Sequence, residues 1–290
     1  MRRTLVFTVT LGVAILMGHA GQTRAADAAA ASAELATAAG RVAVPQVLVI
    51  AHRGDSKVAP ENTLPAFTSA VDAGADLVEL DYYHAADGIP VVFHDETLDR
   101  TTDACQLWGG TKIKLESKTA ADLRALDAGK WFAPKFAGTR LPTLDESLDA
   151  IQRGSMTLIE RKGGDPATCV ELLKQKGLLD RVVVQAFDWD YLEGCHALAP
   201  DLVMAALGHK EMTAARLDDI QRTGARVIAW EDKNTNASTI EEVHRRGYKA
   251  WVWTVDDPQR VTELVNAKID GIITNRPAQT RAAVLAAQSR

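Results

Sequence analysis

Seven side chains that could do acid–base or metal chemistry lie within or just after short apolar runs of this chain. They are His52, Arg53, Glu79, Asp81, His94, Glu160 and Lys162. Side chains two positions apart on a β-strand point to the same side, so Glu79 would lie beside Asp81. Carboxylates that converge in an apolar place repel each other and need positive charge beside them. The spacing therefore predicts a charged site near the ends of several strands.

The three carboxylates form an oxygen-only ligand set. Oxygen ligands favour Mg²⁺ or Ca²⁺ over zinc, so we expect one divalent cation held by Glu79, Asp81 and Glu160. The alternative is a network without metal, in which Arg53 and Lys162 pair with the acids. That network leaves two carboxylates to share one arginine, which favours the metal site.

The two histidines, His52 and His94, come from different segments but are expected at the same face of the fold. Two imidazoles beside a cation and an arginine suit phosphoryl transfer, because one can accept the proton of the attacking oxygen while the other donates to the leaving oxygen. Arg53 could hold phosphate oxygens bidentately. Since a neutral imidazole is also a common metal ligand, one histidine could bind the metal instead.

Glu61, in the sequence PENT, has two interpretations. Asn62 or Thr63 could cap a helix that begins at the next residue, and Glu61 would then belong to a structural turn. Alternatively, its carboxylate reaches the site, where it orients His52 or joins the metal ligands. The sequence does not separate these two roles.

Further candidates stand near the ends of later apolar runs. Gln185 and Phe187 end one run, and Trp251 and Trp253 lie in another. The aromatic side chains could belong to the core. Phe187 and Trp253 lie nearer the expected strand ends, where they and Gln185 could contact the organic part of a substrate.

Eight short apolar runs, rich in Val, Ile and Leu, alternate with helical patterns from residue 47 onward. The runs are 47–51, 76–81, 156–161, 181–187, 202–207, 226–230, 250–255 and 270–275. Continuous apolar runs are typical of parallel strands buried on both faces, and eight of them predict an α/β fold of the (β/α)₈ barrel type, a TIM barrel. A doubly wound open sheet is the rival, but no Gly-x-Gly-x-x-Gly turn follows the first run.

The interval between the second and third runs is long, and we interpret residues of about 84–150 as an insertion after the second strand. Asp87-Gly88 reads as a hairpin turn, and helical patterns follow around 120–126 and 145–152. We expect the insertion to lie over one end of the barrel.

The N-terminus has the pattern of a secretory signal peptide. A basic start is followed by an uncharged apolar stretch over 5–17, which is short for a membrane span. We predict a signal peptide over 1–25, a flexible lead-in over 26–44 and a single barrel domain over 45–290. The mature protein would be periplasmic or secreted, without stable membrane insertion. A retained membrane anchor is the alternative.

Composition disfavours some partners and some chemistry. The chain has 33 Lys and Arg against 38 Asp and Glu, a net charge of −5, and no long basic block. Nucleic acid is therefore not the expected partner. Cys105, Cys169 and Cys195 have no Cys-x-x-Cys spacing, which disfavours a zinc ribbon. In an oxidising compartment one disulfide could form among them, and the sequence does not select the pair.

Taken in order, the motifs resemble those of the glycerophosphodiester phosphodiesterase family. They are AHRG, APENTLPAF, VELD, DGIPVVFHDETLDRTTD, LPTLDESL, the Glu-x-Lys of LIERK, QAFD, WVWTVDD and DGIITNRP, from about residue 48 to residue 277. The chain departs from the usual pattern at Lys57, at Ala85-Ala86, at Arg161 and at Ala186. None of these departures removes a proposed catalytic group.

The resemblance implies a (β/α)₈ barrel that uses one divalent cation to hydrolyse small-molecule glycerophosphodiesters to sn-glycerol 3-phosphate and an alcohol. Carried over residue by residue, it gives the acid/base pair His52 and His94, the metal ligands Glu79, Asp81 and Glu160, and the phosphate contacts Arg53 and Lys162. The family mechanism has the glycerol 2-hydroxyl attack phosphorus to give a cyclic phosphate, which water then opens.

Two other functions are compatible with the sequence. A relative of lysophospholipase D or sphingomyelinase would cleave lipids, and Trp131, Phe132 and Phe136 of the insertion could supply apolar contacts, although packing of the insertion on the barrel explains them as well. A non-catalytic exported protein that binds phosphodiesters is the other alternative. Such a protein would have no need to keep both His52 and His94.

Overall fold

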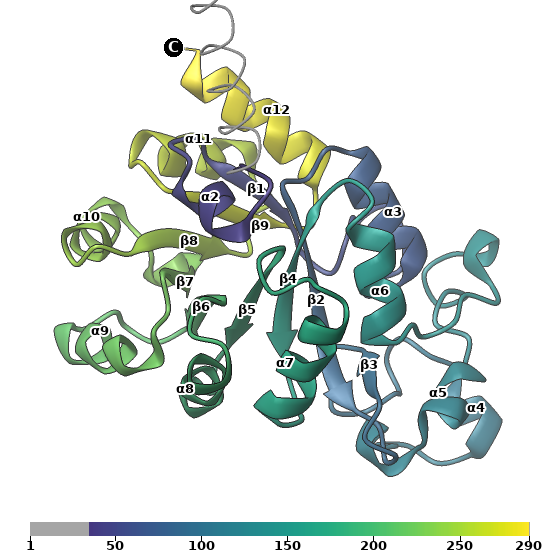
Figure 1. Cartoon of the computed structure of the whole chain (residues 1–290). Coiled ribbons are helices and arrows are strands. Elements are labelled where there is room, and N and C mark those ends of the chain that lie inside the picture. The colour runs from purple at the N-terminus through teal and green to yellow at the C-terminus, as the bar shows by residue number, and fades with distance from the viewer. Residues whose placement is uncertain (1–34, 290) are drawn as a thin grey trace, which may run out of the picture.

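The computed structural model describes residues 35–289, and the predicted signal peptide lies outside them. Eight parallel strands close into a barrel, because β1 pairs with both β2 and β9 (Figure 1). They are β1 (Leu48–Ala51), β2 (Leu77–His84), β4 (Met156–Arg161), β5 (Val182–Ala186), β6 (Val203–Gly208), β7 (Val227–Glu231), β8 (Lys249–Trp253) and β9 (Gly271–Thr274). The predicted (β/α)₈ fold is confirmed.

Helices follow the strands around the outside of the barrel (Figure 1). They are α3 (Leu64–Asp72), α6 (Leu144–Ile151), α7 (Pro166–Gln175), α8 (Trp189–Leu198), α9 (Ala214–Ile220) continued by η3 (Gln221–Thr223), η4 (Asp232–Asn234), α10 (Ala237–Arg245), α11 (Pro258–Asn266) and α12 (Pro277–Gln288). Side chains of Asp165, Asp188 and Asp257 accept hydrogen bonds from backbone N–H groups at the starts of α7, α8 and α11, as expected of N-caps. Among residues 35–289, no helix combines the length and the apolar character that a membrane crossing needs.

Along each strand, side chains alternate between the interior of the barrel and the layer beneath the helices. In β2, Leu77 belongs to the interior cluster, whereas Val78 and Leu80 pack under the helices. Burial of each aliphatic side chain contributes about 1.5–3 kcal/mol to the free energy of folding. A shift of β2 by one residue would lose this contribution, so the alternation is strongly favoured. Glu79 and Asp81 share the parity of Leu77, and both carboxylates therefore point into the barrel above its apolar interior.

The amino ends of the strands are covered by α2 (Ala38–Ala43). Its residues Ala38 and Val42 are buried in the same cluster as the interior side chains of Leu48 and Met156. The Ala38 N–H also donates to the Asp180 carbonyl at 2.6 Å. We expected residues 26–44 to be a lead-in outside the core. The helix instead completes the interior core, because the amino ends of the strands would otherwise leave it open to water.

The segment between β2 and β4 builds a small core of its own beside the barrel. Here β3 (Pro90–Val92) pairs antiparallel with the end of β2. The short helices of this segment are α4 (Ala104–Trp108), η1 (Leu115–Ser117), α5 (Ala120–Arg124) and η2 (Pro134–Phe136). They enclose Leu98, Leu123 and Leu141. By contrast, α6 packs against α3 and the outer cluster of the barrel, so it serves as one of the barrel's own helices.

Three aromatic residues of the insertion pack on one another. The ring of Phe132 stands edge-on to Trp131 and to Phe136, with centroids 5.6 Å apart in both pairs. The Trp131 Nε1–H donates to the Ala128 carbonyl at 2.8 Å. Trp131 is 40% exposed, the largest exposure of the three. This is the arrangement expected if these side chains hold the insertion together.

Replacing Val42 by Ser tests whether α2 is part of the core. The change removes buried apolar surface and buries a hydroxyl, so we predict a loss of roughly 2–3 kcal/mol in the free energy of unfolding, or roughly 4–10 °C in Tm. Thermal unfolding followed by circular dichroism measures it. The control is Ala43→Ser on the exposed side of the same helix. Equal Tm values for the two variants would contradict the assignment.

Candidate active site

The site lies where inward-pointing positions of neighbouring strands reach the carboxyl end of the barrel. Asp81 of β2 is the register partner of Glu160 in β4, and Glu160 is the partner of Gln185 in β5. Glu79 stands one inward position below Asp81. Strand β2 does not end at these carboxylates as the sequence suggested. It continues to His84 because its last residues pair with β3.

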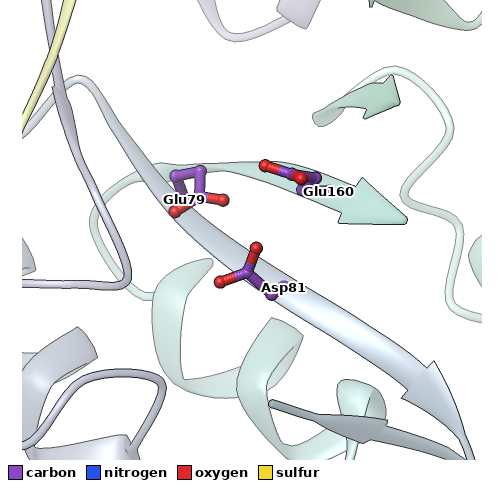
Figure 2. Close-up of side chains that lie close together, drawn as sticks. All are labelled: Glu79, Asp81 and Glu160. Atoms are coloured by element: carbon purple, nitrogen blue, oxygen red, sulfur yellow. The ribbon is translucent and has the colours of Figure 1, made fainter. Parts of the chain in front are cut away.

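Glu79, Asp81 and Glu160 form a buried acidic triad (Figure 2). One oxygen from each lies within 4.8 Å of the others, and Glu79 and Asp81 are completely buried. Glu79 Oε1, Asp81 Oδ1 and Glu160 Oε1 have no hydrogen-bond partner, although the Lys162 ammonium lies within ion-pair distance of the latter two. Three convergent, under-coordinated carboxylates fit an oxygen-liganded divalent cation.

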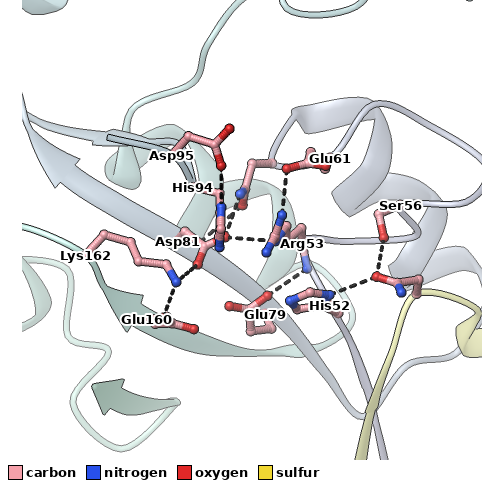
Figure 3. Close-up of polar contacts among 12 residues, drawn as sticks. His52, Arg53, Ser56, Glu61, Glu79, Asp81, His94, Asp95, Glu160 and Lys162 are labelled. Atoms are coloured by element: carbon pink, nitrogen blue, oxygen red, sulfur yellow. Dashed lines mark hydrogen bonds and ion pairs between the residues drawn. The ribbon is translucent and has the colours of Figure 1, made fainter. Parts of the chain in front are cut away.

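The turn after β1 brings Arg53 onto this triad (Figure 3). Arg53 adopts a left-handed φ of 58° and Gly54 one of 81°, and a Cβ on Gly54 would lie 2.7 Å from the Ala66 backbone. The chain therefore folds back sharply, which points the Arg53 N–H at Glu79 Oε2 (2.7 Å) and its Nε at Asp81 Oδ2 (3.3 Å). Strain of this kind is common where a backbone positions functional groups.

Positive charge divides unequally among the three carboxylates. Burial alone would raise the pKa of Asp81, but Lys162 and Arg53 hold it at about 2. Burial and the charge of Asp81 raise the pKa of Glu160 to about 7. Burial, Asp81 and Glu160 raise the pKa of Glu79 well above its usual range. Arg53 and Lys162 thus neutralise one carboxylate well and leave the triad short of positive charge. A network of these two basic residues without a metal ion does not supply the missing charge.

His52 is held in one tautomer. The Asn275 side chain donates through Nδ2 to Asp256 Oδ2 (2.8 Å), which fixes its Oδ1 as the atom 2.8 Å from His52 Nδ1. An amide oxygen only accepts, so Nδ1 carries the proton and Nε2 has a free lone pair. Burial and the neighbouring Arg53 lower the pKa of His52 to about 4. The imidazole is therefore uncharged at neutral pH.

His94 has a different partner. Its Nδ1 lies 2.6 Å from Asp95 Oδ1, and Arg100 binds both oxygens of that carboxylate at 2.6 and 3.0 Å. The pKa of His94 is lowered, because burial and the neighbouring Arg53 outweigh Asp81 and Asp95, which act in the opposite direction. A carboxylate partner stabilises an imidazolium in a way that a neutral amide does not.

Glu61 lies in the turn before α3, as the first of the two interpretations predicts, and its carboxylate binds two arginines rather than His52 or the triad. It contacts Arg53 at 2.8 Å and Arg100 at 2.7 and 3.0 Å, and no contact with His52 or the triad is found. Thr63 occupies the N-cap position of α3 without a capping hydrogen bond. Asn62 clamps Asp81 instead: its Nδ2 donates to Oδ2 at 2.8 Å and its Oδ1 accepts from the Asp81 N–H at 3.2 Å.

A cavity of about 240 Å³ lies above the triad. The predicted residues that line it are His52, Arg53, His94, Glu160, Lys162, Gln185, Phe187 and Trp253. Glu61, Glu79 and Asp81 do not line it. Gln185 Oε1 is buried without a partner, and the edge-on rings of Phe187 and Trp253 (5.6 Å) form an aromatic wall. Arg161 points away from this cavity, toward Asp188 at 3.0 Å.

Five residues of this network were not proposed from the sequence as parts of the site. They are Asn62, Asp95, Arg100, Asp256 and Asn275. Asn62 was considered only as a helix cap, and Asp95 and Arg100 follow His94 in the run HDETLDR. Asn275 contacts His52 across 223 positions of the chain, and no local periodicity predicts such a pairing. The three cysteines are free thiols.

Comparison with known proteins identifies the family. The model of the glycerophosphoryl diester phosphodiesterase family matches residues 52–279. The chain belongs to this family. Its members are phosphoric diester hydrolases, and the matched range contains every residue of the polar network described above.

The similarity extends over nearly the whole length of the relatives. A glycerophosphodiester phosphodiesterase of Caldanaerobacter subterraneus subsp. tengcongensis is 35% identical over 243 residues, or 80% of this chain and 95% of that protein. The structure of an Oleispira antarctica phosphodiesterase in complex with the product sn-glycerol-3-phosphate has a TM-score of 0.76 and 28% identity, covering 82% of this chain and 97% of that chain. A glycerophosphodiester phosphodiesterase structure from Agrobacterium tumefaciens has a TM-score of 0.71 and 29% identity, with 82% and 100% covered.

Protons should compete with a divalent cation for the triad. Unfolded glutamates ionise near pH 4.3, whereas the pKa of folded, cation-free Glu160 is about 7. Ionisation of Glu160 therefore destabilises the cation-free fold fully above about pH 7, and this penalty decreases as the pH falls from about 7 toward about 4.3. Protonation of Glu160 below about pH 7 also competes with the cation. We predict that saturating Mg²⁺ or Ca²⁺ raises the Tm more at pH 8 than at pH 6, and that EDTA reverses the rise. Equal or absent shifts in calorimetry would contradict the site.

Arg100 should act on phosphodiester hydrolysis through Asp95 and Glu61. In Arg100→Gln the carboxylate partner of His94 loses two charged hydrogen bonds, so we predict that kcat falls about tenfold or more, with partial recovery in Arg100→Lys. Because Arg100 is 45% exposed in its side chain, the Tm should change little. The matched control is Arg124→Gln, in which residue 124 of α5 loses its ion pair with Glu146 of α6. Equal kcat values in the two glutamine variants would exclude this positioning role.

Proposed function

We propose that this chain hydrolyses glycerophosphodiesters to sn-glycerol 3-phosphate and an alcohol, with one divalent cation and with His52 and His94 as the proton-transfer pair. The observation that supports it is the convergence of both imidazoles on one cavity, above an acidic triad and beside Arg53 and Lys162. The Oleispira antarctica relative that resembles this chain was solved with sn-glycerol-3-phosphate as its product.

The phosphate would be bound by the basic side chains of the cavity. Arg53 and Lys162 both line it. The divalent cation that Glu79, Asp81 and Glu160 would hold supplies positive charge next to a phosphate oxygen and the attacking hydroxyl. The sequence alone does not choose between Mg²⁺ and Ca²⁺, and both are candidates for this oxygen-only site.

His52 is the proposed base of the first step. It is uncharged at neutral pH, its Nε2 lone pair is free, and it is the more deeply buried of the two histidines. It would take the proton of the glycerol 2-hydroxyl as that oxygen attacks phosphorus. His94 is the proposed acid, since Asp95 stabilises its imidazolium and its side chain is nearer to solvent. It would give its proton to the departing alcohol oxygen.

The attack would form a bond between phosphorus and the 2-oxygen and break the bond from phosphorus to the alcohol oxygen. The product of this step is a cyclic glycerol phosphate, with His52 protonated and His94 neutral. In the second step water attacks phosphorus while His94 accepts its proton, and His52 returns a proton to the 2-oxygen. Both histidines end as they began.

A soluble substrate suits this site better than a lipid. The cavity of about 240 Å³ is lined by charged and polar side chains at one end, and the aromatic residues of the insertion pack on one another. Export to the periplasm or the medium is part of the proposal, and rests on the signal-like pattern of residues 1–25.

Release of glycerol 3-phosphate from glycerophosphocholine by the purified mature protein tests the function. We predict release with Mg²⁺ or Ca²⁺, loss with EDTA, and a fall in kcat of about 10²–10⁴-fold in both His52→Ala and His94→Ala. A glycerol phosphodiester of p-nitrophenol separates the two roles, because this leaving group needs no proton. His94→Ala should recover most of the first-step release of p-nitrophenol from it, and His52→Ala should not.

The alternatives give different results in the same assay. Cleavage of lysophosphatidylcholine in preference to glycerophosphocholine would support a lipid substrate. Recovery of bound, uncleaved diester with both metals would support a binding protein. Recovery of His52→Ala rather than His94→Ala on the nitrophenyl substrate would reverse the acid and base assignments while leaving the reaction in place.

A further inference from the structure

A second cavity of about 200 Å³ lies next to the catalytic cavity. It opens at the carboxyl ends of β5, β6 and β7, and it shares Phe187 and Leu207 with the catalytic cavity. The other side chains that matter are Trp189, His209, Lys210, Arg216 and Trp230. Phe187 is 41% exposed and stands edge-on to His209, with centroids 5.5 Å apart. A substrate can therefore extend across Phe187 from one cavity into the other.

Hydrogen bonds fix the wall of this cavity before any ligand binds. The indole N–H of Trp189 donates to the Leu207 carbonyl at 3.0 Å, and that of Trp230 donates to the Lys210 carbonyl at 2.6 Å. A Cβ on Gly208 would lie 2.1 Å from the Trp230 ring, so only glycine lets the indole lie against the loop after β6. A preformed wall loses little conformational freedom on binding.

The charge of the cavity is positive. Neither Lys210 nor Arg216 forms an ion pair with a carboxylate of residues 35–289, and Arg216 Nη1 donates only to the Glu211 backbone carbonyl at 2.6 Å. The acids at the start of α8 pair with other bases: Asp188 pairs with Arg161, and Asp190 and Glu193 pair with Arg222. The Glu211 carboxylate is not part of the lining.

We infer that this second cavity binds the alcohol part of the diester, and that it selects alcohols carrying a phosphate of their own. Two unpaired cations on a rigid aromatic wall suit the oxygens of a second phosphate. They would disfavour a quaternary ammonium such as choline, which the aromatic rings alone would attract. The inference rests on the proposed function, because it assigns the group that leaves from the catalytic cavity.

Two substrates that differ by one phosphate test the inference. Glycerophosphoglycerol carries a neutral alcohol, and glycerophosphoglycerol phosphate carries the same alcohol with a second phosphate. We expect kcat/KM to be about tenfold or more higher for the phosphorylated substrate, because its second phosphate gains charge-assisted hydrogen bonds. The ratio of the two kcat/KM values should fall with added salt, which screens these charges. In Lys210→Gln combined with Arg216→Gln the ratio should approach one.

The control is Lys233→Gln, which removes an exposed lysine that pairs with Glu231 outside the cavity. It should keep the ratio of the native protein. Equal kcat/KM values for the two substrates in the native protein, or a ratio that survives the double substitution, would overturn the inference. If neither substrate is cleaved, the proposed function fails. Calorimetric binding of the uncleaved phosphorylated substrate then tests the second cavity by itself. The double variant must bind this substrate more weakly than the native protein does, and equal binding would overturn the inference.

Discussion

Three buried carboxylates converge at two successive inward levels of a closed barrel, and much of the surrounding structure follows from that constraint. Like charges in an apolar surrounding are costly unless positive groups lie beside them. Arg53 reaches the triad through a left-handed turn, Lys162 directly follows the strand that carries Glu160, and Asn62 holds Asp81 through two hydrogen bonds. These groups stabilise the ionised form of Asp81 most. The remaining deficit of positive charge is what makes a divalent cation the natural completion of the site.

The two histidines differ in the side chains that hold them. A neutral amide, itself fixed by Asp256, holds His52. A carboxylate, itself fixed by Arg100, holds His94. The two imidazoles therefore have different electrostatic surroundings. Glu61 links the triad to the surroundings of His94, because it contacts both Arg53, which binds the triad, and Arg100, which binds Asp95.

The sequence predicts the parts of this site that depend on strand geometry. The two-residue period carries Glu79 and Asp81 inward together with Leu77, and the apolar runs predict the barrel. It does not predict contacts that depend on how distant loops meet. Asn275 with His52 and Arg100 with Glu61 are such pairs. The expectation that the lead-in lies outside the core was also wrong. The apolar face of α2 packs on the interior of the barrel, and this contact exists only once the barrel has formed.

The cation content of the purified protein, measured together with its turnover of glycerophosphocholine, tests the central claim most directly. Elemental analysis after dialysis against Mg²⁺ or Ca²⁺ should find about one equivalent per chain, and Glu79→Gln and Glu160→Gln should lose both the metal and the turnover while keeping the barrel's circular dichroism. Full turnover in protein that holds no divalent cation, or unchanged metal content in both variants, would contradict the account.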